Sequence, residues 1–159
     1  MIVRGETTGA CPMMPRTCAA LLMMTFLVAP STAMAQQFQG DLDPAPHDFS
    51  NRDDVVGIGI VSATLSGTTL TITGNFTGLS SPATAAHLKT GLAMGVPGAT
   101  IGELTATHAA KGEISGSIKL NSAQITALRK GALYIQLDSV KGKDGNSWAW
   151  LESDERPRV

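Results

Sequence analysis

The chain has 159 residues, which is the length of one domain. Its 12 basic and 13 acidic residues give a formal net charge of −1, which excludes a nucleic-acid binder that relies on bulk positive charge and a polybasic membrane patch. A hydrophobic content of 43% excludes a largely disordered chain.

Residues 1–35 have the pattern of a secretory signal peptide. An uncharged apolar run occupies residues 19–29, a basic residue precedes it, and Ala33-Met34-Ala35 follows it as a cleavage-site motif. A spanning helix needs about 20 apolar residues, so this run is too short for a permanent anchor. The leader is long at its front, and its alternative start is Met13 or Met14.

We predict cleavage between Ala35 and Gln36. Both cysteines of the chain, Cys11 and Cys18, lie in the leader, so the mature protein has none and forms no disulfide. Removal of 35 residues from 159 leaves 124, enough for one hydrophobic core without disulfides. The sequence therefore predicts a secreted or periplasmic protein without a permanent membrane anchor.

The two ends of the mature chain show little periodicity. We expect residues 36–54 to be an extended N-terminal segment and residues 152–159 to be a C-terminal tail. The domain itself is expected over residues 55–151.

Within residues 55–151 the chain alternates apolar and polar residues over short segments separated by glycine. The clearest segments are residues 69–77, 113–120 and 132–138, which place Leu, Ile and Phe on one face. About seven such segments, spaced about ten residues apart, predict an antiparallel sandwich or barrel.

Residues 122–130 break this pattern and predict one short helix. Asn121 is a suitable N-cap, and Gln124 three residues later completes a capping box. Gly131 follows as a C-terminal stop that favours a positive φ. At about nine residues, the helix is expected to connect two strands.

Four stretches of this sequence resemble the chordin-type (CHRD) domain family. They are Gly74-Asn75-Phe76-Thr77-Gly78-Leu79, Ala83-Thr84-Ala85-Ala86-His87-Leu88, Lys111-Gly112-Glu113-Ile114-Ser115-Gly116 and the longer stretch 120–135. The resemblance implies a secreted Greek-key β-sandwich that occurs in extracellular proteins and has no activity generally attached to it. We therefore expect an all-β, antiparallel Greek-key β-sandwich with one short helix, in a diverged secreted member of bacterial type.

His87 is the principal candidate for a metal ligand. Family members usually carry His-x-His where this chain has His87-Leu88-Lys89, and His-Thr where it has Asp138-Ser139. Imidazole nitrogens two residues apart on a strand project side by side and suit copper or zinc, but Lys89 is no ligand. Asp138 is the second candidate ligand, from a neighbouring strand. The competing interpretation is that His87 makes structural hydrogen bonds.

Trp148 and Trp150 are the only tryptophans, and their spacing on a strand points them to the same side. If that side faces solvent, they form a platform for a sugar ring, a peptide or another subunit. If it faces the protein interior, they are its largest members, because aromatic burial dominates core energetics.

The sequence carries no motif for a catalytic nucleophile or a dinucleotide cofactor, so we expect no enzyme and no cofactor. The leading hypothesis is a secreted or periplasmic non-enzymatic binding or structural module, whose partner is an unknown extracellular protein or polymer. The alternative is a copper- or zinc-binding, or redox-related, extracytoplasmic protein centred on His87.

Overall fold

The structure, a computed structural model, describes residues 34–46, 52–92 and 96–153. These residues belong to the unit Thr32–Val159. The predicted leader lies outside the described residues except for its last two positions. The described elements are β1 (Gln36–Pro44), β2 (Ile58–Ser66), β3 (Thr69–Thr77), β4 (Ala83–Thr90), β5 (Thr100–Ala106), β6 (Gly112–Lys119), α1 (Ser122–Arg129), β7 (Leu133–Ser139), β8 (Ser147–Trp150) and β9 (Glu152–Ser153).

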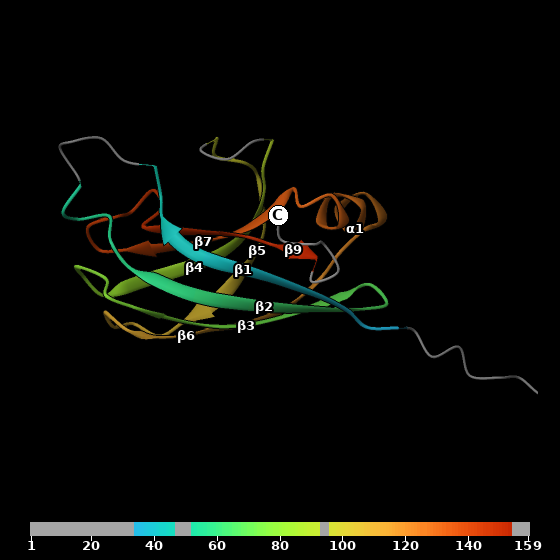
Figure 1. Cartoon of the computed structure of the whole chain (residues 1–159), viewed down its shortest axis with the longest axis horizontal. Helices are drawn as coiled ribbons and strands as arrows, with labels where there is room; N and C mark the ends of the chain where they lie inside the picture. Colours follow the sequence, from blue (N-terminus) through green and yellow to red (C-terminus); the bar gives the residue numbers. More distant parts are fainter. Residues whose placement is uncertain (1–33, 47–51, 93–95, 154–159) are drawn as a thin grey trace, which may run out of the picture. The chain divides into compact units, whose positions relative to one another are not determined.

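Eight of these strands close into a barrel (Figure 1). Around the barrel the order is β1-β2-β3-β6-β5-β4-β7-β8, and β8 pairs again with β1. The two-residue strand β9 adds to β1. An all-β, antiparallel fold with one short helix is thus confirmed, whereas the expected Greek-key β-sandwich is wrong because the ladder of paired strands is closed.

β1 and β5 close the barrel, because the two ends of each of these strands pair with different neighbouring strands. Residues 36–42 of β1 pair with β2, and residues 43–44 pair with β8. In the same way residues 100–104 of β5 face β4, and residues 105–106 face β6. Inward and outward residues alternate in the same way in a sandwich and a barrel. The sequence pattern could therefore not separate the two folds.

The barrel interior is filled by the inward residue of each alternating pair. As predicted, β3 buries Leu70, Ile72 and Phe76, and β7 buries Leu133 and its alternate neighbours. Leu128 of α1 packs on the same cluster. Among the described residues, no helix is long and apolar enough to cross a membrane.

The helix begins and ends as the sequence predicts. The Asn121 side chain accepts from the Gln124 backbone at 2.9 Å, and the Gln124 side chain accepts from the Asn121 backbone at 2.9 Å. At the other end Gly131 has a φ of 70° and donates to Leu128, while Ala132 donates to Ala127. These two bonds form a Schellman motif, which turns the chain directly into β7.

The N-terminal boundary differs from the expectation. Residues 36–44 form β1, with Phe38 and Leu42 buried in the barrel, so the expected boundary at residue 55 falls inside the fold. The alternation is hard to see because Gly40 occupies the inward position between them. A side chain at Gly40 would collide with the carbonyl of Trp150, so close strand packing explains the glycine. The expected tail likewise contributes β9.

Candidate functional site

The strand β7 is buried on both faces, although only one face lines the barrel interior. Its outward residues are Tyr134, Gln136 and Asp138. Segments that follow β1 and β4 cover this outer face. Ala45 donates to the carbonyl of Asn146, and Gly98 donates to the Tyr134 hydroxyl at 3.0 Å. The outer face of β7 is therefore covered and not open to solvent.

Three aromatic rings lie together on this face. The centroid of Tyr134 is 5.1 Å from that of Trp148 and 4.9 Å from that of Trp150, with tilted ring planes. Trp148 is 8% exposed and packs with Ala45 and Val55, whereas Trp150 is only partly buried. The rings therefore form a second, smaller hydrophobic cluster on the outside of the barrel.

A polar chain runs beside the rings along β4 and β7, formed by Lys89, Gln136, Asp138 and His87. The Lys89 ammonium donates to the Gln136 amide oxygen at 3.0 Å. The Gln136 amide nitrogen donates to Asp138 Oδ1 at 2.7 Å, and His87 Nε2 lies 3.2 Å from Asp138 Oδ2. Both Asp138 oxygens are thus engaged by its neighbours.

Two buried nitrogens on this face have no hydrogen-bond partner among the described residues. They are His87 Nδ1 and Trp148 Nε1. Gln136 lies between them, because it is opposite His87 in one ladder and opposite Trp148 in the next. An unpaired buried donor or acceptor costs about 1–3 kcal/mol, so each position favours a group that would satisfy it.

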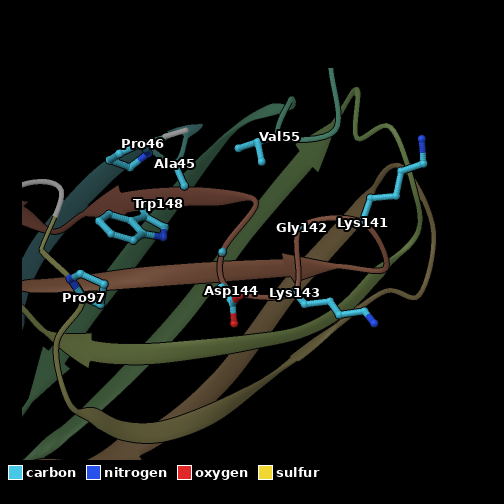
Figure 2. Close-up of a pocket in the computed structure, with 10 residues that line it drawn as sticks. Ala45, Pro46, Val55, Pro97, Lys141, Gly142, Lys143, Asp144 and Trp148 are labelled. Atoms are coloured by element: carbon cyan, nitrogen blue, oxygen red, sulfur yellow. The ribbon is translucent and has the colours of Figure 1, made fainter. Parts of the chain in front are cut away.

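Trp148 also forms part of the wall of a pocket of about 220 Å³ (Figure 2). The apolar part of the lining consists of Ala45, Pro46, Val55, Pro97 and Trp148. The turn between β7 and β8 contributes the rest, including Lys141, Lys143 and Asp144. In Figure 2 the side chains of Lys141 and Lys143 extend away from the indole, so the charges lie at the rim.

Buried polar residues hold the two walls of the pocket together. The Asn146 side-chain amide donates to the carbonyl of Asp54 at 3.0 Å and to the Ser139 hydroxyl at 3.1 Å. Ser80 also donates to the Asp54 carbonyl, at 2.7 Å. Asn146 and Ser139 are fully buried. The segment that carries Val55 is therefore fixed to the turn that carries the lysines, and the pocket is preformed.

One rim charge is already paired. Lys141 Nζ lies 2.9 Å from Asp54 Oδ1 on the surface. The hydrogen bond to Asp54, together with the attraction of the Asp54 and Asp53 carboxylates, raises the pKa of Lys141 above its ordinary value. Lys141 is therefore cationic at neutral pH and is neutralised by Asp54. An exposed pair of this kind contributes little to stability.

The sequence matches the CHRD domain family over residues 38–146. The chain belongs to the CHRD domain family. No curated protein and no solved structure matches it. CHRD is a non-enzymatic domain family that occurs in extracellular proteins, which is consistent with a protein that is not an enzyme. The match begins within β1 and ends at the residue before β8, two residues before Trp148, so both tryptophans lie beyond it.

For this CHRD domain, the structure places the two predicted metal ligands side by side. His87 and Asp138 contact each other across neighbouring strands. The same contact makes Asp138 a partner that orients the imidazole, in the way that carboxylates orient metal-binding histidines. In the described part of the chain, no group of three or more His, Cys, Asp or Glu side chains is placed to hold a metal. Metal binding at His87 and Asp138 stays a prediction.

The two tryptophans point to the same side, as their spacing indicates, while Ala149 and Leu151 face the barrel interior. They do not form an open platform, because Trp148 is covered. Sequence reasoning missed Tyr134, Asn146 and the Asp54 carbonyl. The alternation in residues 132–138 predicts a solvent-facing side for β7, and the segments that cover it come from distant parts of the sequence.

Proposed function

We propose that this CHRD domain is an exported, non-enzymatic binding module whose ligand site is the pocket beside Trp148. The observation that supports this most directly is the preformed pocket of about 220 Å³, whose lining includes Trp148 and whose walls Asn146 joins. A preformed cleft that combines apolar walls with a few polar groups is the usual form of a ligand site.

The surroundings of the pocket agree with a binding role. Its apolar walls offer contact area, and Asn146 holds them in place, which lowers the ordering cost of binding. The His87–Asp138 pair resembles the histidine and carboxylate of a catalytic site, but no nucleophilic side chain bonds to His87 among the described residues. Binding is therefore a better interpretation of this face than catalysis.

A ligand survey by ¹⁵N–¹H NMR tests the proposed site. Small amides, carboxylates and sugars would be titrated into the ¹⁵N-labelled protein. We expect at least one class to shift the Trp148 indole resonance and the amides of Val55 and Gly145, in a saturable way. If no compound perturbs these resonances, the pocket is not a ligand site.

Export is the second part of the proposal. The leader pattern in residues 1–35 supports it, as does the extracellular occurrence of CHRD domains. N-terminal sequencing of the protein recovered outside the cytoplasm is expected to begin at Gln36. A cytoplasmic species that retains residues 14–35 would refute the export.

The alternative function, a copper or zinc protein centred on His87, has one specific observation in its favour. His87 Nδ1 is buried and has no hydrogen-bond partner among the described residues, while Nε2 contacts Asp138, so one ring nitrogen is left to serve as a ligand. The test is metal analysis of protein purified without chelator or affinity tag. Stoichiometric copper or zinc that is abolished by His87→Ala would establish the alternative, and substoichiometric metal in both forms would exclude it.

A further inference from the structure

Gln36, the first residue that the predicted cleavage would leave, is placed for a modification of its own. We propose that the mature protein closes Gln36 into an N-terminal pyroglutamate, a five-membered lactam, and that Arg129 promotes the ring closure. This inference rests on the export part of the proposed function, because only cleavage after Ala35 turns the Gln36 nitrogen into an amine.

The position of Gln36 in the fold is the first step. Gln36 is the first residue of β1, where it is opposite Leu65 of β2, and it is exposed. Ala35 before it is also exposed and belongs to no strand. Cleavage of the bond between them would therefore leave the new amino group at the exposed end of β1, while the rest of the strand stays paired.

The reaction itself takes place within one residue. The amine nitrogen of Gln36 attacks the side-chain carbonyl carbon Cδ, the new N–Cδ bond closes the ring, and the Cδ–Nε2 bond breaks. The leaving nitrogen takes a proton from the attacking one and departs as ammonia, so no oxidant, reductant or water is consumed. Rotation about the side-chain bonds brings the two atoms together, and exposed side chains change rotamer within picoseconds to nanoseconds.

A guanidinium lies at the carbonyl that would be attacked. Arg129 Nε, in the last turn of α1, donates to Gln36 Oε1 at 3.0 Å. A cationic donor polarises the carbonyl and stabilises the negative oxygen that forms during the attack. The same charge disfavours the ammonium form of the new amine beside it, which leaves more of the neutral nucleophile. Both residues are exposed, so the guanidinium can follow the oxygen as the glutamine side chain turns.

The product also fits the end of the strand. The lactam keeps one hydrogen on the main-chain nitrogen and leaves the main-chain carbonyl of Gln36 unchanged, so the ladder with β2 is retained. The ring oxygen is still an acceptor for Arg129. Closure removes a positive charge beside the guanidinium, together with the free amine that aminopeptidases require. The first residues of β1, which pair with β2, are thereby protected from trimming.

Mass spectrometry of the exported protein is the first test, with the N-terminal peptide sequenced by fragmentation. We expect a peptide that begins at Gln36 and is lighter than its unmodified sequence by the mass of one ammonia. A peptide that begins at Gln36 with a free amine would overturn the inference and leave export intact. A chain that begins elsewhere would overturn both the predicted cleavage and the inference.

The rate of closure is the second test. The chain is released from an N-terminal fusion partner by a protease that cuts directly before Gln36, and the loss of ammonia from the folded protein is followed by intact mass. Arg129→Ala removes the guanidinium, and Lys130→Ala is the matched control because it removes the neighbouring exposed cation. Since water weakens the effect of exposed charges, we expect Arg129→Ala to slow closure about threefold and Lys130→Ala to leave the rate unchanged.

Unfolded protein completes the comparison. In denaturing urea we expect the wild-type chain and Arg129→Ala to close at the same rate, because unfolding separates Gln36 from Arg129. Equal rates in the folded proteins, or equal slowing by Arg129→Ala and Lys130→Ala, would overturn the role of the Arg129 contact. If the folded wild-type chain kept its free amine while the unfolded chain cyclised, the fold would protect Gln36 and the whole inference would fail.

Discussion

At the level of single residues, His87 lies in a contact with Asp138 that joins two neighbouring strands. Its side chain is 22% exposed and its partner Asp138 is 11% exposed, so the pair is largely shielded from water. Removal of the imidazole leaves Asp138 Oδ2 without its neighbour, and a charged group left unpaired in a shielded site is destabilising.

We predict that His87→Ala lowers the free energy of unfolding by about 1–3 kcal/mol, measured by urea denaturation. Leu133→Ala should cost more, about 2–5 kcal/mol, because Leu133 is fully buried in the barrel and its removal leaves a cavity. The exposed His108→Ala is the control and should change stability by less than about 0.5 kcal/mol. A His87→Ala loss as small as that of His108→Ala would show that the contact between His87 and Asp138 is unimportant.

A second prediction at this scale concerns Asn146, because its side chain joins the two walls of the pocket. Asn146→Ala removes the donors to the Asp54 carbonyl and the Ser139 hydroxyl, and we expect a loss of about 1–3 kcal/mol in urea melts. The exposed Asn75→Ala on β3 serves as the matched control. Equal urea midpoints for the two variants would contradict a structural role for Asn146.

The site could be predicted from the sequence only in part. The spacing of Trp148 and Trp150 correctly places both rings on one side, and His87 and Asp138 are brought into contact. What covers the rings is set by Ala45, Val55 and Gly98, which are far away in sequence. Local periodicity reports which face of a strand a residue occupies, and it carries no information about distant segments that pack on that face.

At the level of elements, α1 is the part that the sequence predicts most completely. Its cap, its capping box and its stop are local interactions, each decided by residues within about five positions. β1 is the opposite case, because its glycine at position 40 is explained only by the approach of Trp150. An element that local hydrogen bonds stabilise can be predicted from the local sequence. An element that long-range packing stabilises cannot be predicted in this way.

The helix stop gives a prediction at this scale. Gly131→Val should destabilise the domain by about 1–3 kcal/mol in urea melts, since a β-branched residue tolerates a φ of 70° poorly. Gly131→Asn should cost clearly less, because asparagine adopts this conformation more readily. If valine and asparagine were equally tolerated, the Schellman motif would not be what limits this position.

For the molecule as a whole, closure of the barrel depends on its first strand. β1 joins β2 through residues 36–42 and β8 through residues 43–44, so it links two neighbours that are otherwise separated. A closed barrel has no exposed edge strands, whereas loss of β1 would expose the edges of both neighbours. The predicted cleavage after Ala35 would leave β1 complete, because the strand begins at Gln36.

This dependence yields the last prediction. A chain that starts at Gln36 should unfold in one cooperative urea transition, whereas a chain that starts at Asp41 should be far less stable. The shorter chain loses the ladder of residues 36–40 with β2 and the buried ring of Phe38.

Phe38→Ala in the chain that starts at Gln36 isolates the contribution of the buried Phe38 ring. We expect this substitution to lower the free energy of unfolding by about 3–5 kcal/mol. We expect the Asp41 chain to be less stable than this variant, because it also loses the strand pairing. Equal urea midpoints for the Gln36 and Asp41 chains would mean that the barrel closes without this half of β1. In that case cleavage several residues beyond Ala35 would be compatible with a folded protein, and the position of the cleavage site would no longer be constrained by the fold.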